Sequence, residues 1–433
     1  MIETVRKARV PIVIVMSIAF IVVQDTLNTI FHVQGPVTVL IAGLLALIAL
    51  ASLAGKHSAF SSRAVPVPMM LFIVWAVVRF AMHPSVIGLQ NLLVWTIFPL
   101  TIGVVFSRSE PGTFERAYPW WKVATVVASF IYLIEVVREG LGANVFPYAS
   151  RGSGWLSLMA LVLVAPAATL LRQSKWPLIL LISAIVLSES RTPMAIALVM
   201  GVFTFALRPF KKRLPSTRRI VTRVLAASLA GGAVAYLAIT QVPFVRDRFA
   251  VGDGFSVGGV EVNTSGRFVL WPITIAQWQQ SPWIGNGPGS AQTLITNRFP
   301  GFISHPHNEY LRFLDDTGMV GMALWGLGML ILLQRAAKSI RKSTDLIDRT
   351  LHTSALLALV VMLLGAITDN ITISVYCIMI SGTVIGLSAR RRQDRLDGTS
   401  IRPYMTPDKL RARSEFVHFD PLTGKVARQV TYK

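Results

Sequence analysis

The chain has 433 residues, of which 53% are hydrophobic and 15% are charged, and its mean hydropathy is +0.58. Soluble domains carry roughly 25% charged residues, so this composition excludes a soluble enzyme. A formal net charge of +21 would favour nucleic acid as the partner of a soluble protein. In a membrane protein the same charge marks the cytoplasmic side, so no nucleic-acid partner is expected. The single cysteine, Cys377, excludes an internal disulfide framework.

Apolar runs along the chain predict an all-α polytopic membrane protein with about 12 transmembrane helices. The runs lie near residues 11–31, 36–54, 65–82, 86–106, 119–137, 154–171, 176–189, 193–207, 220–240, 317–334, 351–369 and 371–388. They predict an integral membrane domain over residues 1–388, a large loop at 241–316 within it, and a basic tail at 389–433. In the tail, residues 415–430 alternate around Asp-Pro-Leu-Thr-Gly and predict a small hairpin.

The basic residues are distributed unevenly between the two sides of the predicted membrane. The side of the N-terminus receives 33 of the 42 Lys and Arg residues, which predicts that both termini are cytoplasmic. The nine on the outer side are all arginines: Arg79, Arg138, Arg151, Arg191, Arg246, Arg248, Arg267, Arg298 and Arg312. The overall excess of Arg over Lys is one explanation, and bidentate binding of phosphate by guanidinium groups is the other.

The turn Ser188-Glu189-Ser190-Arg191-Thr192-Pro193 lies on the outer side between two apolar runs of about 13 to 15 residues. A full span needs about 20 residues, so the runs predict a hairpin whose tip lies at the depth of the lipid phosphates. Arg191 would then be placed to bind phosphate. The alternative is an interfacial arginine that pairs with Glu189.

The outer loop contains one segment with helical periodicity. Apolar residues at 268, 271, 275 and 278 predict an amphipathic helix at the membrane interface, with Trp271 and Trp278 as anchors. Arg267 opens this helix, where a cation gains nothing from the helix dipole. It therefore favours an anion site shared with the free backbone N–H groups, and a solvated loop arginine is the alternative.

The run Gly285-Asn286-Gly287-Pro288-Gly289 follows in the same loop. Its spacing is not that of a phosphate-binding loop, and no strand precedes it. It predicts a turn that lets the chain pass close to another element.

Residues 305–318 read His-Pro-His-Asn-Glu-Tyr-Leu-Arg-Phe-Leu-Asp-Asp-Thr-Gly. Pro306 predicts an extended entry, Asn308 a helix N-cap, and Gly318 a bend in the span that follows. His307 then lies at the start of the helix, where a neutral imidazole can accept a proton; it can also serve as a hydrogen-bonding group. No metal site is predicted, because no further ligands with metal-site spacing accompany the two histidines.

Together these motifs resemble the bacterial O-antigen ligase and polymerase family over residues 155–388, most closely over 264–322. The shared features are Ser-Arg-Thr in an outward turn, an arginine opening a loop helix, Pro-Trp-Ile-Gly-Asn-Gly, His-Asn-Glu-Tyr-Leu and Thr-Gly-x-x-Gly. The resemblance implies a GT-C-like fold, in which a periplasmic loop with short interfacial helices joins membrane helices. It places the protein in the bacterial inner (cytoplasmic) membrane as a multi-pass glycosyltransferase.

The resemblance also implies a reaction. A saccharide would pass from an undecaprenyl diphosphate-linked glycan donor to a hydroxyl of a lipid A-core or polysaccharide acceptor, with inversion and without a metal or other cofactor. By motif match, Arg191 and Arg267 correspond to arginines that bind the diphosphate, and His307 to the catalytic base. The residues that would bind sugar or orient His307 are Arg312, Asn308, Tyr310 and Glu309.

Two other functions stay open at this stage. A polysaccharide polymerase shares these motifs and differs only in its acceptor. A flippase or exporter of lipid-linked glycan would also need outward arginines, but transporters generally carry internal repeats and midplane charges. The sequence shows no repeat, and Asp25 and Glu135 are its main charged residues within the apolar runs.

Overall fold

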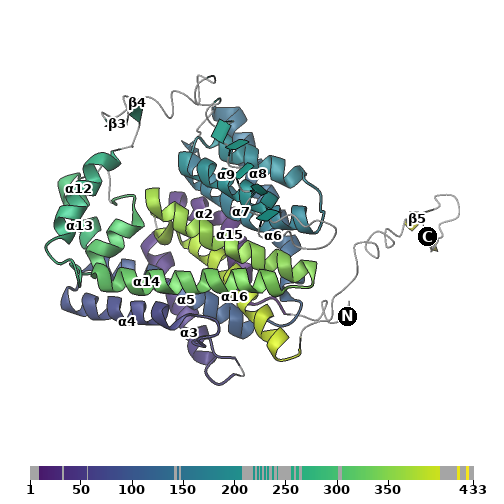
Figure 1. Ribbon diagram of the computed structural model, residues 1–433, viewed down its shortest axis with the longest axis horizontal. Helices are drawn as coiled ribbons and strands as arrows, with labels where there is room; N and C mark the ends of the chain where they lie inside the picture. The colour runs from purple at the N-terminus through teal and green to yellow at the C-terminus, as the bar shows by residue number, and fades with distance from the viewer. Residues whose placement is uncertain are drawn as a thin grey trace.

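The computed structural model describes residues 9–206 with gaps at 32–33, 56, 141–143 and 146–147, scattered residues over 218–262, residues 266–399 with a gap at 301–304, and two short strands in the tail. The described chain is almost entirely helical (Figure 1). This confirms the predicted all-α polytopic membrane protein. The described strands form three short antiparallel hairpins: β1 (Asn144–Val145) with β2 (Tyr148–Ala149), β3 (Phe255–Val257) with β4 (Val260–Val262), and β5 (Val417–Phe419) with β6 (Val426–Arg428). The last of these confirms the hairpin predicted in the tail.

Each predicted apolar run except 220–240 coincides with a helix, and that run lies mostly outside the described residues. The first helices are α2 (Ile12–Phe31), α3 (Gln34–Ala51), α4 (Val67–Met82), α5 (Val86–Arg108), α6 (Thr113–Glu139), α7 (Ser150–Leu170), α8 (Trp176–Leu187) and α9 (Arg191–Ala206). The later ones are α12 (Arg267–Trp278), α13 (Ser290–Arg298), α14 (Glu309–Lys342), α15 (Leu346–Thr368), the 3₁₀ helix η1 (Ile371–Ile373) and α16 (Val375–Leu396).

Five of the described helices are long and apolar enough to cross a membrane. They are α5, α6, α7 from Gly152 onward, α14 and α15, and shorter apolar helices occur within α2, α3, α4, α8 and α9. The α8 and α9 helices are joined by a tight turn, as the short apolar runs predicted. The total of 12 crossings stays a prediction.

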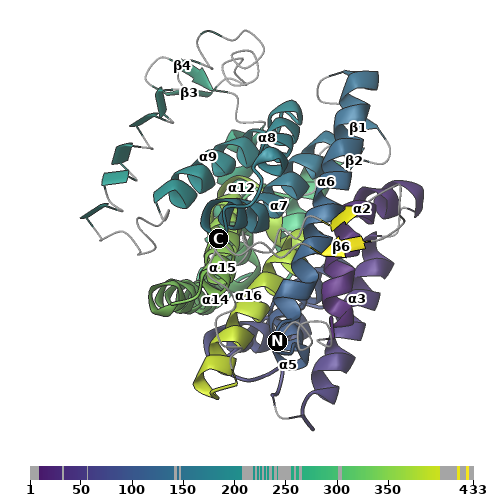
Figure 2. The same ribbon diagram turned by 90° about the vertical axis from the view of Figure 1, so that its right-hand side faces the viewer.

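The centre of the bundle is the contact between α5 and α16, flanked by α3, α7 and α15 (Figures 1 and 2). Glycines on α16 let the two backbones approach closely, because a Cβ atom at Gly386 would lie 2.7 Å from the carbonyl oxygen of Ile102. Buried aliphatic side chains from both helices fill the remaining space. This packing fixes α16, and with it the short segment between α15 and α16, relative to the rest of the bundle.

The α14 helix bends at Gly318, as predicted. Gly318 has φ +69° and ψ −175°, and a Cβ atom there would lie 2.3 Å from the carbonyl oxygen of Trp283. Only glycine accommodates both the left-handed φ and this contact. The bend also provides new partners for backbone groups, because the N–H of Met319 donates to the carbonyl of Pro282 and that of Val320 to Trp283. The outer loop is thereby attached at the bend.

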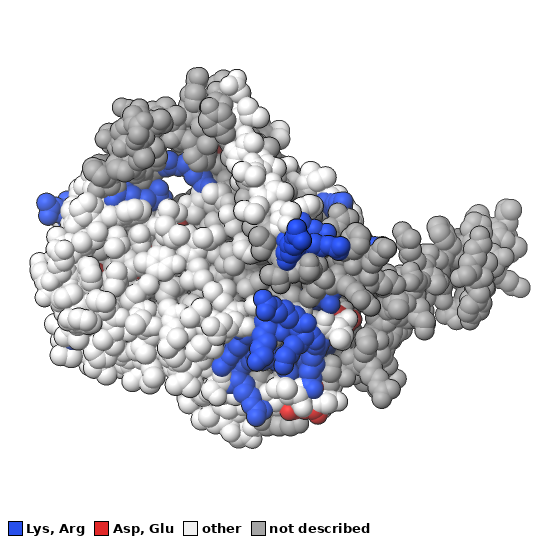
Figure 3. Space-filling view, in the orientation of Figure 1, with Lys and Arg blue, Asp and Glu red and all other residues white. Residues whose placement is uncertain are grey.

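The C-terminal end of α16 differs from the sequence prediction. The predicted apolar run ends at 388, but the helix continues to Leu396 and includes Arg390, Arg391 and Arg392. Arg391 is buried and pairs with Glu115 and Asp348, and Arg390 pairs with Asp394. Basic side chains gather over this end of the bundle, whereas most of the face over α14 is uncharged (Figure 3).

Candidate active site

His307 has an unusual backbone conformation. Its φ is +52°, in the left-handed region that non-glycine residues seldom adopt. Hydrogen bonds on either side hold it there: the indole N–H of Trp271 donates to the carbonyl oxygen of Pro306 at 3.0 Å, and the Asn308 side chain caps α14 by accepting from Leu311 N–H. Strain that is held in this way occurs often at functional sites. The predicted N-cap at Asn308 is confirmed.

The His307 side chain contacts two residues that follow α15. Its Nδ1 atom lies 3.0 Å from the side-chain nitrogen Nδ2 of Asn370 and 3.7 Å from Oδ1 of Asp369. Asp369 is itself oriented, since its Oδ2 accepts from the indole N–H of Trp155 at 2.8 Å. The imidazole keeps 19% of its surface exposed, while the Asp369 side chain keeps 8%. A histidine oriented by a buried carboxylate and an amide is suited to proton transfer.

Sequence reasoning missed Asp369 and Asn370. The available signal was a polar Asp-Asn pair between two apolar runs on the outer side of the predicted membrane. Nothing in the sequence around His307 indicates a partner more than 60 positions further along the chain. Only the packing of α14 against α15 brings the two segments together.

Arg191 is the first residue of α9, directly after the turn that joins α8 to α9. The hydroxyl of Thr192, the next residue, lies 2.9 Å from the hydroxyl of Thr368 at the end of α15. The turn also packs tightly on α7, because a Cβ atom at Gly154 would lie 2.5 Å from Ser188 Oγ. The backbone of Arg191 is therefore held beside the segment that contacts His307. The Arg191 side chain is half-buried.

Arg267 opens α12, as predicted, and its side chain is half-buried. The most buried residues of α12 are Leu270 and Thr274, which are not part of the predicted interfacial stripe at 268, 271, 275 and 278. The membrane contact of that stripe stays a prediction. The two tryptophans expected to be membrane anchors make hydrogen bonds within the protein, Trp271 to Pro306 and Trp278 to Pro282. Packing against α14 therefore determines which side of α12 faces inward.

Two segments contact Thr368, Asp369 and Asn370, and a third is attached to the residue before His307. The pair of threonine hydroxyls attaches the start of α9, the imidazole of His307 contacts the next two residues, and Trp271 attaches α12 to the residue before His307. Arg191 precedes Thr192, which makes the first of these contacts, and His307 makes the second. Arg267 lies on α12, four residues before Trp271, which makes the third.

The four predicted sugar-binding residues lie next to His307 but are occupied within the protein. Asn308 caps α14, and the Tyr310 hydroxyl donates to the carbonyl of Leu363 at 2.7 Å. Glu309 and Arg312 are completely buried and pair with each other at 2.7 Å. Arg312 also donates to the Thr372 hydroxyl at 2.8 Å. Glu309 and Arg312 are therefore not positioned to contact a sugar. Their contacts join α14 to η1 instead.

The glycine run at 285–289 forms the predicted turn, and it binds a carboxylate of the protein's own. Asp316 accepts hydrogen bonds from the N–H groups of Gly289 and Ala291, each at 3.0 Å, and from the Ser290 hydroxyl. The carboxylate thereby caps the start of α13, where the helix dipole favours negative charge. Close packing explains the glycines, because a Cβ atom at Gly285 would lie 2.5 Å from the backbone nitrogen of Gly318.

Replacing Asp316 with Ala is expected to destabilise the protein by about 3 kcal/mol. The side chain is fully buried, and its loss leaves the N–H groups of Gly289 and Ala291 without their acceptors, at about 1–3 kcal/mol for each buried unsatisfied group. The Ser290 hydroxyl keeps Asp315 as an acceptor. Thermal unfolding of the purified protein in detergent measures the effect. Asp397→Ala is the matched control, because Asp397 is exposed. Equal melting temperatures for the two variants would contradict the capping role.

Part of the chain matches a known family. Residues 176–326 match the family model described as O-antigen ligase. Over this segment the chain is similar to O-antigen ligases. The matched segment contains Arg191, Arg267 and His307, and it ends beyond the bend of α14. Asp369 and Asn370 lie outside it. A comparison with curated proteins finds no similar sequence.

The family match and the apolar helices together indicate a bacterial membrane protein. The match extends from α8 to the middle of α14 and so includes the hairpin, the described part of the outer loop and the bend. The helices that support it, including α5, α7, α15 and α16, lie outside the matched segment. The His307 contact therefore joins a residue within the family domain to residues beyond it.

Proposed function

We propose that this protein transfers a saccharide from an undecaprenyl diphosphate carrier to a hydroxyl group of the lipid A core, at the outer face of the bacterial inner membrane. The observation that carries the proposal is the contact of His307 with Asp369 and Asn370, next to the threonine pair at the start of the helix that carries Arg191. The helix of Arg267 is attached to the residue before His307 through Trp271. Glycosyl transfer in O-antigen or polysaccharide biosynthesis is the activity that the family match supports.

In the proposed reaction, the two arginines stabilise the diphosphate leaving group. As the acceptor oxygen forms a bond to the anomeric carbon, the bond from that carbon to the diphosphate oxygen breaks, and negative charge develops on the diphosphate. Guanidinium groups from two separate elements can bind its two phosphates and stabilise this charge. In the proposed reaction Arg191 and Arg267 have this role, and no metal ion is needed. A single displacement inverts the anomeric centre.

In the proposed reaction, His307 activates the acceptor hydroxyl, which is the nucleophile. An acceptor hydroxyl is a weak nucleophile, so a base that takes its proton during the attack accelerates the reaction. In the proposal, the Nε2 atom of His307 accepts this proton. Asp369 and Asn370 hold the other ring nitrogen, so they act as positioning residues. Asp369 also stabilises the imidazolium that forms.

The orientation of the protein is part of the proposal. The α14 and α16 helices begin near His307 and end at the arginine-rich end of the bundle. Basic residues concentrate on the cytoplasmic side of membrane proteins, so the arginine-rich end lies in the cytoplasm and the His307 end faces outward. In the proposal, both termini lie in the cytoplasm and the site faces the leaflet where a carrier-linked donor is exposed.

Deleting the protein from its host should remove long polysaccharide chains from lipid A and leave carrier-linked polymer in the membrane. Gel analysis of lipopolysaccharide, together with extraction of lipid-linked glycan, measures both results. A single repeat unit left on lipid A would overturn the lipid A-core acceptor in favour of a polymerase. Lipid-linked glycan that accumulates only on the cytoplasmic side would instead indicate a flippase or exporter.

A further inference from the structure

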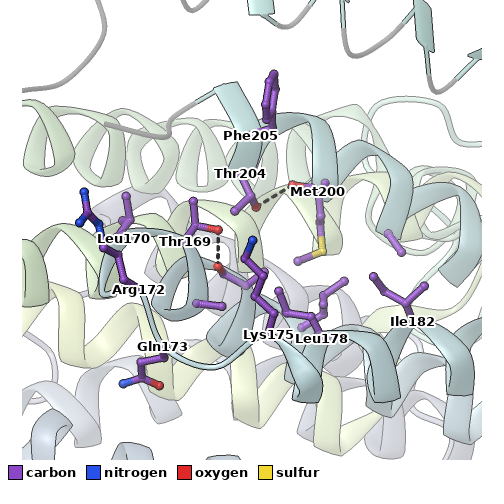
Figure 4. Close-up of a pocket in the computed structure, with 15 residues that line it drawn as sticks. Thr169, Leu170, Arg172, Gln173, Lys175, Leu178, Ile182, Met200, Thr204 and Phe205 are labelled. Atoms are coloured by element: carbon purple, nitrogen blue, oxygen red, sulfur yellow. Dashed lines mark hydrogen bonds between the residues drawn. The ribbon is translucent and has the colours of Figure 1, made fainter. Parts of the chain in front are cut away.

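A pocket separate from the active site lies between α7, α8 and α9. Its volume is about 470 Å³, within the range of about 300–1,000 Å³ that is usual for small-molecule sites. Most of its wall is apolar and includes Leu161, Leu178, Ile182, Met200 and Phe205 (Figure 4). Polar side chains gather at the end where α7 passes into α8.

Small residues account for the hollow. Ala165 and Ala168 of α7 face Ala197 and Gly201 of α9 across the pocket. A Cβ atom added at Gly201 would meet nothing within 4 Å, so the space beside it is open. Interiors of folded proteins are normally packed to high density, and an open apolar space between helices is suited to an apolar ligand.

The polar end of the pocket is basic. Arg172 and Lys175 line it together with Gln173, and Figure 4 shows the Lys175 side chain extending between Thr169 and Leu178. Both basic residues are exposed, and neither forms an ion pair with any carboxylate among the described residues. The chain that follows α9 offers none either, because residues 207–246 contain no Asp or Glu.

The pocket and the active site lie at opposite ends of the α8–α9 hairpin. Arg191 begins α9, whereas the pocket is lined by the later residues 197–205 and by the beginning of α8. The 16 residues of α9 span about 24 Å, at 1.5 Å per residue. A molecule with its charged group at Lys175 therefore does not occupy the region around His307.

We propose that this pocket binds an anionic phospholipid of the membrane leaflet opposite the active site. The phosphate lies against Arg172 and Lys175, and an acyl chain lies along the apolar wall between α7 and α9. Basic pockets between membrane helices bind anionic headgroups in this way. The chemistry of the pocket supports one occupant that is negatively charged at one end and apolar along its length. The bound chain would support the hairpin that carries Arg191.

Native mass spectrometry of the full-length protein in detergent tests the proposal, with phosphatidylglycerol as the probe and phosphatidylcholine as the zwitterionic comparison. The unmodified protein is expected to bind phosphatidylglycerol preferentially. The variant Arg172→Gln/Lys175→Gln should weaken this binding by about 30-fold, at roughly 1 kcal/mol for each basic residue. Gly201→Leu should weaken the binding of both lipids, because it fills the pocket.

Two control variants test the location. Lys338→Gln/Arg341→Gln removes two exposed basic residues of α14, and Gly326→Leu enlarges a glycine that also has open space around it. Neither should change lipid binding. If the controls weaken binding as much as the pocket variants do, or if Gly201→Leu binds normally, the proposed location is wrong.

Competition identifies the occupant. Inorganic phosphate at millimolar concentration should not displace phosphatidylglycerol, because it lacks the acyl chain; displacement would indicate a free-phosphate site. Undecaprenyl phosphate should compete poorly, and its preferential binding would overturn the proposal in favour of the donor's polyprenyl chain.

Alkylation of the Gly201→Cys variant adds a final test. The thiol should react in delipidated protein and be protected by phosphatidylglycerol, whereas protection without lipid would show that the chain itself covers the pocket.

Discussion

Arg191→Ala and Arg267→Ala are each expected to lower the rate of glycan transfer by about 100- to 1,000-fold. This is the usual cost of removing one donor that stabilises charge in the transition state. The measurement is transfer from an undecaprenyl diphosphate-linked donor by purified protein in detergent or lipid. Lysine replacements should recover only part of the rate, because an ammonium keeps the charge but loses the bidentate fork.

Arg298→Ala is the matched control for both arginines. Arg298 lies in the same outer loop, at the end of α13, and its side chain is exposed. Its replacement should leave transfer within about two-fold of the unmodified rate. Membrane insertion and melting temperature should be similar for all three variants, which separates a catalytic loss from misfolding. A normal rate for Arg191→Ala would remove the hairpin from the proposed diphosphate site.

The helices could be predicted from the sequence because a lipid environment restricts the backbone conformations that a spanning segment can adopt. Backbone groups in the hydrocarbon region must be satisfied within a helix, so apolar length alone locates most helices. Local signals were equally clear at Asn308 and Gly318, where a cap and a bend depend on the residue type. The ends of helices were less accurate, as α16 shows, because ion pairs to Glu115 and Asp348 let it continue through three arginines.

The faces of the helices and the partners of the site could not be predicted in the same way. The periodicity of α12 indicates an apolar side, but contact with α14 determines which residues are buried, and Thr274 is among them. Glu309 and Arg312 were expected to reach sugar because they are polar and lie near His307. Their mutual pairing in the interior depends on Thr372, which is 60 positions away from Arg312. Such contacts arise only from tertiary packing.

The second large effect is expected at His307, where replacement with Ala should lower transfer by about 100- to 10,000-fold, the usual contribution of a general base. Donor binding should change little, because the imidazole acts on the acceptor hydroxyl. His307→Gln is the closest control, since it keeps a polar side chain of similar size without a basic nitrogen. Rates of the two variants within a few-fold of each other indicate that proton transfer is what was lost. A His307→Ala variant with normal transfer would contradict the role as base.

Asn370 provides a finer test of the same role, because it determines which ring nitrogen of His307 carries the proton. For Nε2 to accept a proton, Nδ1 must carry a hydrogen and donate it to an acceptor. The side-chain nitrogen of Asn370 lies 3.0 Å from Nδ1. Rotating the Asn370 amide by half a turn puts its oxygen in that position, and this oxygen is the acceptor. Asn370→Asp offers an acceptor in either orientation, and its negative charge stabilises the imidazolium. This variant should therefore keep activity but require a higher pH, because the base must be neutral at the start of the reaction. Asn370→Leu offers no acceptor and should lose at least ten-fold in rate across the pH range. If both variants keep the rate and the pH dependence of the unmodified protein, Asn370 does not position the base, and orientation of the imidazole falls to Asp369 alone.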